Sequence, residues 1–320
     1  MAPSHSGVQM KIFIGAVLAV ACAQPVFACD FCAVYSATEA QGNSGKGFFG
    51  GLAEQYTYFN TFQSGGRDQR NPDAEYLNSL MSQAFVGFNF NNRIGVQLNL
   101  PIIYREYGAI AEGGSGRVHG SEVGLGDALL LGNFHLYKSR TVDYTFNWNG
   151  LAGIKFPTGN SHHLNPTEPD FATGIGGHDL ALGSGSFDGV VGTDIFARWK
   201  KGFLTAGTQY SIRSEGDFGY QYANDLSWSG GPGMYLALKD DYTLSLQAIV
   251  SGETKGQDTR RGVATDDTAE TAVYLGPQIN FTWESQLSAQ VGADLPVSIH
   301  SSGDQIVPTF RIHAALTWRF

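Results

Sequence analysis

The sequence has few charged residues and no basic cluster. Asp, Glu, Lys and Arg make up 15% of the 320 residues, and the formal net charge is −9. A surface that binds a phosphate backbone needs clustered Lys and Arg side chains, so this composition argues against a nucleic-acid partner. Small molecules and ions remain open as ligands.

Long apolar runs are also missing. The run over 12–21 is too short to cross a bilayer as a helix, which needs roughly 20 residues. Lys11 precedes this run and Val26-Phe27-Ala28 follows it, which is the pattern of a signal peptide over residues 1–28. Cys29 would then begin the exported chain. A lipid anchor on Cys29 is the alternative, although the residues before it match a lipidation signal poorly.

Cysteine is nearly absent, which leaves little room for a disulfide framework. Cys22 leaves with the predicted signal peptide, so the exported chain keeps Cys29 and Cys32 in C-x-x-C spacing. In an oxidising compartment this pair predicts a disulfide, and a metal or redox contact is the alternative, as is an unpaired or lipidated state. Ala33 follows the second cysteine where covalent haem attachment requires His.

Glycine, aromatic residues and strict alternation are what the sequence does have. It contains 42 Gly, 14 Tyr and 21 Phe. Over 307–320, apolar residues such as Ile312 and Trp318 alternate with polar ones such as Arg311. In a membrane barrel this pattern places the apolar row on lipid and the polar row in the lumen. The terminal Phe320 resembles the signal by which the barrel-assembly machinery recognises its substrates for insertion.

The alternation recurs often enough to predict the fold. Segments of roughly the length that a tilted membrane strand requires follow one another along the chain. We therefore predict an all-β protein, a transmembrane antiparallel β-barrel of about twelve strands over 47–320, preceded by a periplasmic segment over 29–46. The predicted strands are 47–59, 79–91, 93–105, 125–138, 144–155, 187–199, 204–212, 226–239, 242–248, 273–283, 287–295 and 307–320.

The connections between these segments alternate in length. Tight turns are expected at 91–93, 139–141, 200–201, 239–241 and 284, and long loops at 60–78, 106–124, 156–184, 214–225, 253–269 and 299–306. Short periplasmic turns and long external loops are typical of outer-membrane barrels, so we expect this location, lipid contact and periplasmic termini. A soluble all-β repeat protein is the alternative, but it explains neither the rhythm of the loops nor the export signal.

Charged residues on the inward rows are the candidate functional residues. A barrel of this size leaves a narrow lumen, and the longest loop, 156–184, is the best candidate to restrict it. The inward charges have two interpretations: a salt-bridge ladder that stiffens the wall, or a slightly basic lining that favours anionic or polar solutes. The inward candidates are Arg105, Asp127, Lys155, Asp194, Arg198, Arg213, Asp294, Arg311 and His313.

Metal and catalytic chemistry have weaker support. His162, His163 and His178 lie in the longest loop and could bind a transition metal, but their spacing matches no compact motif, and exposed loop histidines are usually solvated. The Ser and His neighbours at 119–121 and 300–302 lack a third catalytic partner. We therefore expect no enzyme activity and no cofactor.

Four short stretches resemble the outer-membrane barrels of the meta-pathway phenol-degradation family. They are Leu98–Tyr104 with an embedded Leu-Pro, Gly124–Asp127 at the start of a strand, Gly153–Gly159 with Lys-Phe-Pro-Thr-Gly, and Leu182–Ser186. The resemblance implies a barrel with a diffusion pathway for small molecules, aromatic ones included. The Cys-x-x-Cys pair does not belong to that pattern, so the resemblance does not supply the solute.

The sequence therefore predicts an outer-membrane channel or transporter for the passive passage of small solutes, aromatic or anionic ones among them. The alternative is a barrel that conducts little and docks a periplasmic redox or metal protein through Cys29 and Cys32. A membrane-embedded hydrolase is the third class, and no catalytic arrangement supports it.

Overall fold

The computed structural model describes residues 46–71, 73–110, 116–167, 174–284 and 286–320. The predicted signal peptide and the Cys29 and Cys32 pair lie outside the described residues. Within the described residues, every helix is too short or too polar to cross a membrane.

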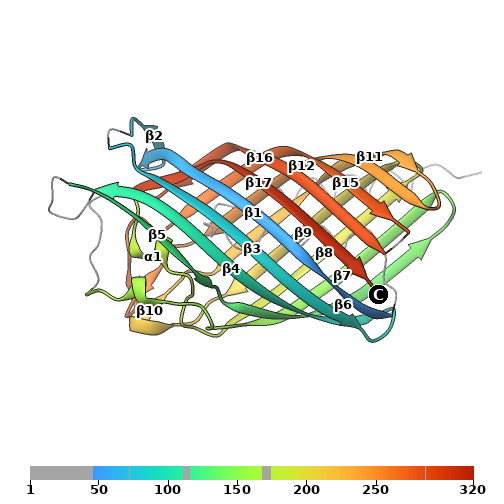
Figure 1. The fold of residues 1–320 in the computed structure, drawn as a ribbon, viewed down its shortest axis with the longest axis horizontal. Helices are drawn as coiled ribbons and strands as arrows, with labels where there is room; N and C mark the ends of the chain where they lie inside the picture. Colours follow the sequence, from blue (N-terminus) through green and yellow to red (C-terminus); the bar gives the residue numbers. More distant parts are fainter. Residues whose placement is uncertain (1–45, 72, 111–115, 168–173, 285) are drawn as a thin grey trace, which may run out of the picture.

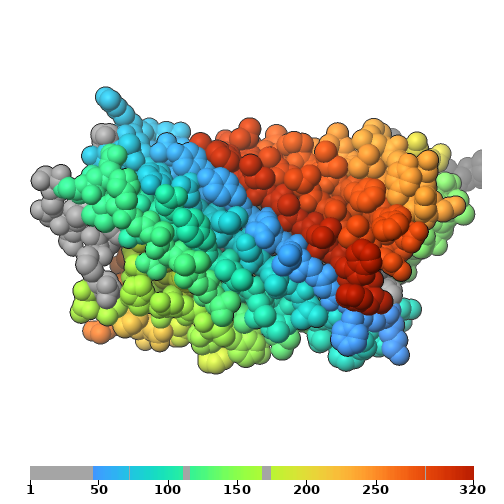
Figure 2. All heavy atoms as spheres, in the orientation of Figure 1, coloured from blue at the N-terminus to red at the C-terminus, as the bar shows by residue number. Residues whose placement is uncertain are grey.

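Twelve wall strands pair antiparallel in chain order, and β17 returns to β1 to close the barrel (Figure 1). The predicted all-β fold and strand number are confirmed. Figure 2 shows the closing seam, where β1 in blue runs beside β17 in red. The wall consists of β1 (Gly47–Ser64), β3 (Tyr76–Asn89), β4 (Ile94–Ile110), β5 (Arg117–Leu125) with β6 (Ala128–Arg140), β7 (Tyr144–Phe156), β8 (Asp188–Trp199), β9 (Gly202–Ile212), β11 (Asp225–Leu238), β12 (Tyr242–Lys255), β15 (Glu270–Trp283), β16 (Leu287–Ser301) and β17 (Asp304–Arg319).

Alternation along each strand separates a lipid face from a lumen. Leu52, Ile154 and Ile312 belong to the outward rows and are exposed, whereas Gln55 and Asn149 belong to inward rows and are buried. Successive strand residues point to opposite faces, so one side of the wall becomes apolar and the other polar. An apolar exterior around a polar interior is the arrangement that a bilayer requires of a barrel.

The two ends of the barrel differ. Tight turns join β3 to β4, β6 to β7, β8 to β9, β11 to β12 and β15 to β16, and the ends of the wall at Gly47 and Arg319 lie at this same end. We call it the turn end; it lies on the right in Figure 1. We call the opposite end the loop end. It carries the long connections, as the sequence predicts.

Two predicted long loops are wrong: most of 106–124 is strand, because β4 runs to Ile110 and β5 begins at Arg117, and 299–306 is not a long loop either. The connection expected over 299–306 is a tight turn at Ser302 and Gly303, because β16 and β17 continue well past the apolar belt. Gly303 adopts a φ of +56°, and its carbonyl accepts a hydrogen bond of 2.7 Å from the N–H of Gly65. The left-handed conformation and this bond allow the two strands to reverse without a longer loop.

A break divides the wall strand between β5 and β6. The sequence predicts that Gly124–Asp127 opens a strand, but pairing with β4 already begins at Arg117. Opposite the break, Pro101 lacks the N–H that a ladder needs, and its carbonyl accepts a hydrogen bond of 2.9 Å from the N–H of Gly126. The stretch therefore marks an interruption within a strand, and Asp127 sits at that interruption.

The loop end carries its own small structures. A short hairpin, β2 (Arg67–Gln69), extends β1, and β10 (Tyr220–Gln221), β13 (Thr259–Arg260) and β14 (Val263–Ala264) form a separate three-stranded sheet. The buried Tyr220 hydroxyl donates to Asp258 at 2.6 Å. Burial and then the negative charge of Asp258 raise the pKa of the Tyr220 phenol, so the group stays a protonated donor.

Candidate solute-binding site

The long connection between β7 and β8, residues 157–187, folds inward at the loop end, and we call it the inner loop. It contains a 3₁₀ turn (His162–Leu164) and the short helix α1 (Gly177–Leu180), whose terminal leucines are fully buried. The two halves of the inner loop meet near the wall, where the carbonyl of Asn160 accepts hydrogen bonds from the N–H groups of Leu182 and Gly183 at 2.9 and 3.0 Å.

The tip of the inner loop packs on a distant part of the wall. Ile175 and Leu180 form one apolar cluster with residues of β1, β3, β4 and β17, among them Phe59, Leu77 and Ile306. The N–H of Ile306 also donates to the carbonyl of Gly174 at 2.9 Å. Because the inner loop leaves the wall at β7 and β8, these contacts carry it across the lumen.

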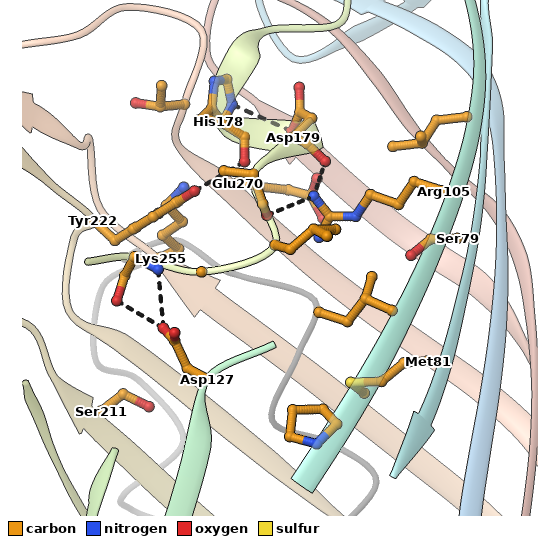
Figure 3. Close-up of a pocket in the computed structure, with 18 of the residues that line it drawn as sticks. Ser79, Met81, Arg105, Asp127, His178, Asp179, Ser211, Tyr222, Lys255 and Glu270 are labelled. Atoms are coloured by element: carbon orange, nitrogen blue, oxygen red, sulfur yellow. Dashed lines mark hydrogen bonds and ion pairs between the residues drawn. The ribbon is translucent and has the colours of Figure 1, made fainter. Parts of the chain in front are cut away.

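Arg105 fastens the middle of the inner loop to β4. Its side chain is 2% exposed, and Nη1 donates to the carbonyl oxygens of Asp179 and Ala181, the latter at 3.0 Å (Figure 3). From another side, the Tyr222 hydroxyl donates to the carbonyl of His178 at 2.9 Å. Hydrogen bonds from a charged donor are among the stronger ones, so Arg105 is the main polar tether of this segment.

Five charged residues form a ladder around the wall at the level where the inner loop begins and ends. Lys155 Nζ lies 2.6 Å from Asp127 and 2.7 Å from Asp188. Arg213 continues the series, at 3.1 Å from Asp188 and 2.6 Å from Asp225. We call this set the ion-pair ladder. Its side chains are largely shielded from solvent, and each buried carboxylate has a cationic partner, as burial requires.

The ladder also holds the return of the inner loop. Ser184 donates through its N–H and its hydroxyl to Asp127 at 2.9 and 2.8 Å, and the Ser186 hydroxyl donates to Asp188 at 2.8 Å. A Cβ on Gly183 would lie 2.6 Å from the Cα of Gly159. Only glycine allows the two halves of the inner loop to approach this closely.

A cavity of about 180 Å³ lies between the inner loop and the wall (Figure 3). The side formed by β1, β3, β4 and β17 supplies most of the apolar lining, with the polar Ser79, Gln83, Asn99 and Arg105 among it. The other side is polar and comes from the ladder and the loops. The apolar side includes Phe59, Leu77, Met81, Ile103, Leu182 and Ile306, and the polar side includes Lys155, Ser184, Ser211, Arg213, Tyr222 and Lys255.

A second cavity of about 70 Å³ lies toward the turn end. Its lining is rich in uncharged polar side chains such as Gln247 and Gln278, with Phe203 and Tyr235 at one side. His313 bridges two of its lining residues: Nδ1 lies 3.4 Å from Asp294, and Nε2 lies 3.2 Å from the Gln278 amide oxygen. The lumen thus changes from an amphipathic to an amide-rich lining along its length.

No family model and no curated protein matches the sequence. The fold matches the crystal structure of an outer-membrane channel from Pseudomonas putida F1 with a TM-score of 0.63, at 12% identity over 91% of this chain and 100% of that chain. The chain has the fold of an outer-membrane β-barrel.

Other solved outer-membrane proteins align less closely with this barrel. The transport unit of the autotransporter AIDA-I from Escherichia coli gives a TM-score of 0.45 at 9% identity, over 90% of this chain and 93% of that chain. A FadL homologue from Pseudomonas aeruginosa gives 0.38 at 10% identity, over 88% and 92%. At such identities the likeness concerns the fold alone.

The charged residues singled out from the sequence occupy four places in this outer-membrane barrel. Arg311 lies between the cavities, 2% exposed, where it pairs with Glu253 and its guanidinium stacks 3.6 Å from the Tyr274 ring. Arg198 lies at the turn end and donates to the carbonyls of Val142 and Lys200. Arg105, Asp127, Lys155 and Arg213 line the first cavity, and Asp194, Asp294 and His313 line the second.

The histidines of the inner loop do not gather. Among the residues that the structure describes, no three His, Cys, Asp or Glu side chains are grouped as a metal site would require. The rings of His162 and His163 are in contact, with centroids 4.0 Å apart and planes tilted by 43°. His163 Nε2 lies 3.0 Å from Glu122, without the alignment of a hydrogen bond, and His178 lies 3.3 Å from Asp179.

Three residues of the first cavity escape sequence reasoning. Tyr222, Lys255 and Glu270 lie in or beside the long loops, where the alternation that marks inward residues stops. Lys255 and Glu270 are the last backbone partners in the pairing of β12 with β15. Lys255 and Glu270 would have been found only by extending the two predicted strands by seven and three residues toward the loops.

Proposed function

We propose that the barrel is a passive outer-membrane channel for small solutes that combine an apolar body with a polar group. The observation that carries this proposal is the mixed lining of the first cavity, which brings the apolar Met81 and Ile103 together with the polar Ser211 and Tyr222. Apolar walls with a few convergent polar groups are typical of small-molecule sites. The resemblance of the sequence to the meta-pathway phenol-degradation barrels supports the same solute class.

The size of the cavity supports a one-ring solute. Its volume is about 180 Å³. An apolar protein cavity of about 150 Å³ accepts benzene, so a single ring with a small polar substituent fits here without enlarging the wall. Larger solutes would require the inner loop to move.

The order of residues along the strands suggests the route. On β17, Ile306 belongs to the first cavity, Arg311 follows, and His313 belongs to the second cavity. On β12, Lys255 belongs to the first cavity, and Glu253 follows it in the direction of the second cavity. The buried Arg311 and Glu253 pair therefore lies between the two cavities, and a passing solute must cross this polar layer.

Solute uptake into vesicles tests the proposal. The mature chain, reconstituted into phosphatidylcholine vesicles, should pass benzenesulfonate, a one-ring solute that does not cross the bilayer by itself, faster than glycerol, relative to empty vesicles. Met81→Gln should reduce the benzenesulfonate rate several-fold and leave the glycerol rate nearly unchanged, because it places an amide among the apolar lining of the cavity. Equal rates for wild-type and empty vesicles, or an equal effect of the substitution on both solutes, would contradict the proposal.

A further inference from the structure

The turn end carries a basic corner made by two neighbouring turns. We define the corner by the exposed residues Arg140, Val142, Trp199, Lys200 and Lys201, which belong to the β6–β7 and β8–β9 turns. Residues 138–143 and 198–202 together contain five Lys or Arg and a single acid, although the whole chain has a net charge of −9. Positive charge is therefore concentrated at this corner, although the chain as a whole is negatively charged.

The two turns of the basic corner are fixed to each other. The N–H of Lys200 donates to the carbonyl of Asp143 at 2.7 Å. The Arg198 guanidinium spans both turns, since it donates to the Lys200 carbonyl at 2.9 Å, to the Thr145 hydroxyl at 3.2 Å and to the Val142 carbonyl at 3.4 Å. The exposed cations are thus presented on one preformed surface.

The basic corner continues directly into the apolar belt. Tyr144 pairs with Trp199 in the ladder between β7 and β8, and Tyr137 and Phe146 lie beside them as ring neighbours. Trp199 is 71% exposed and carries Lys200 Nζ 5.9 Å from its ring centroid. Such aromatic groups occupy the headgroup level of a membrane, which places the cations of the two turns at the depth of lipid phosphates.

We infer that the basic corner binds the phosphate groups of anionic phospholipids in the leaflet that faces the turn end. Lys and Arg side chains next to a membrane are attracted to anionic headgroups, and an aromatic belt beside them sets their depth. Val142, which is 93% exposed at the tip of its turn, suits an interfacial location better than open water. An acidic protein partner would account for the charges but not for their continuity with the lipid-facing aromatic residues.

Lipid binding by native mass spectrometry tests this inference. The mature barrel in neutral detergent is titrated with phosphatidylglycerol and, separately, with phosphatidylcholine of the same acyl chains. We expect phosphatidylglycerol to bind more tightly than phosphatidylcholine. In the triple variant R140Q/K200Q/K201Q, the ratio of the two affinities should fall roughly tenfold. High salt should weaken the preference of the wild-type protein, because the contacts lie at the surface.

A matched variant separates a site from a general charge effect. R67Q/R70Q/R261Q removes the same charge from exposed positions at the loop end and should keep the wild-type preference. Equal affinity of the wild-type barrel for both lipids would overturn the inference, as would an equal loss in both variants. Retained solute uptake in R140Q/K200Q/K201Q vesicles shows that the variant is folded and that its lipid phenotype is independent of the channel.

Discussion

At the scale of one residue, Glu54 places a carboxylate on the lipid face of β1. Glu54 lies in the outward row of β1 between Leu52 and Tyr56, and it accepts a hydrogen bond of 2.6 Å from the Ser82 hydroxyl on β3. For a strand tilted by roughly 40°, its distance along the membrane normal from Phe48, which begins the same row, is about 15 Å. Glu54 therefore lies deep in the apolar belt.

Glu54→Leu should stabilise the barrel. Charged groups on the lipid face are costly near the bilayer midplane, and the gain from removing this one should be on the order of 1–2 kcal/mol in the free energy of unfolding. Denaturant unfolding in phosphatidylcholine vesicles measures it, with Glu54→Gln expected to give a smaller gain in the same direction. A destabilised Glu54→Leu barrel would mean that the carboxylate makes a needed contact on this face.

Arg105→Met should release the inner loop while leaving the wall closed. The side chain tethers the carbonyls of Asp179 and Ala181, and its loss removes the charged donor that holds them. We expect larger and noisier single-channel conductance in planar bilayers and faster protease cleavage within the inner loop. Arg105→Lys should show an intermediate effect, because one ammonium group does not reproduce the fork of a guanidinium. Unchanged conductance would show that apolar contacts alone hold the inner loop.

At the scale of elements, the inner loop should be removable as a unit. Its two halves meet where the Asn160 carbonyl bonds to Leu182 and Gly183, so a Gly-Gly link in place of 161–181 joins ends that are already adjacent. The ladder contacts of Gly159 and Ser184 with Asp127 remain. We expect a folded barrel with a several-fold higher conductance, measured in planar bilayers. Deleting 261–264 at the β13–β14 tip is the control and should leave conductance near the wild-type value.

The strands could be predicted from the sequence because each one must satisfy lipid and lumen at once. In β17, Ile312 and Trp318 face lipid while Arg311 faces the lumen. Apolar and polar residues must therefore alternate along the strand. Where strands rise past the apolar belt, both faces meet polar surroundings and the pattern fades. For that reason β4 and β16 continue past Arg105 and Leu295, where the predicted strands end.

The candidate site could be predicted only in part. Alternation identifies Arg105 and Lys155 as inward-facing, since it fixes which face of a strand a residue occupies. It does not give the register between strands, so the pairing of Arg311 with Glu253, fifty-eight positions apart, is set only in the folded wall. The inner loop has no periodic pattern, and its contacts depend on the wall that it packs against.

At the scale of the whole molecule, the closing seam joins the first and last wall strands directly. β1 and β17 pair from Phe49 and Arg319 at the turn end to Ser64 and Asp304 at the loop end, and the N–H of Phe320 donates to the Phe48 carbonyl at 3.0 Å. The first and last wall strands therefore cover each other, and among the described wall segments only β5, at the loop end, has a strand on one side alone.

A chain that begins at residue 46 should therefore refold and conduct like the full mature chain. We expect the same heat-modifiable migration on gels and the same single-channel conductance, because the seam and both cavities are intact. In the mature chain, C29S/C32S should also leave conductance unchanged. If the shortened chain folds but no longer conducts, the periplasmic segment is part of the pathway. If both proteins fold and neither they nor the wild-type chain conducts, the barrel serves to dock a partner through the cysteine pair, and capture of a periplasmic protein by the wild-type chain but not by C29S/C32S would establish that role.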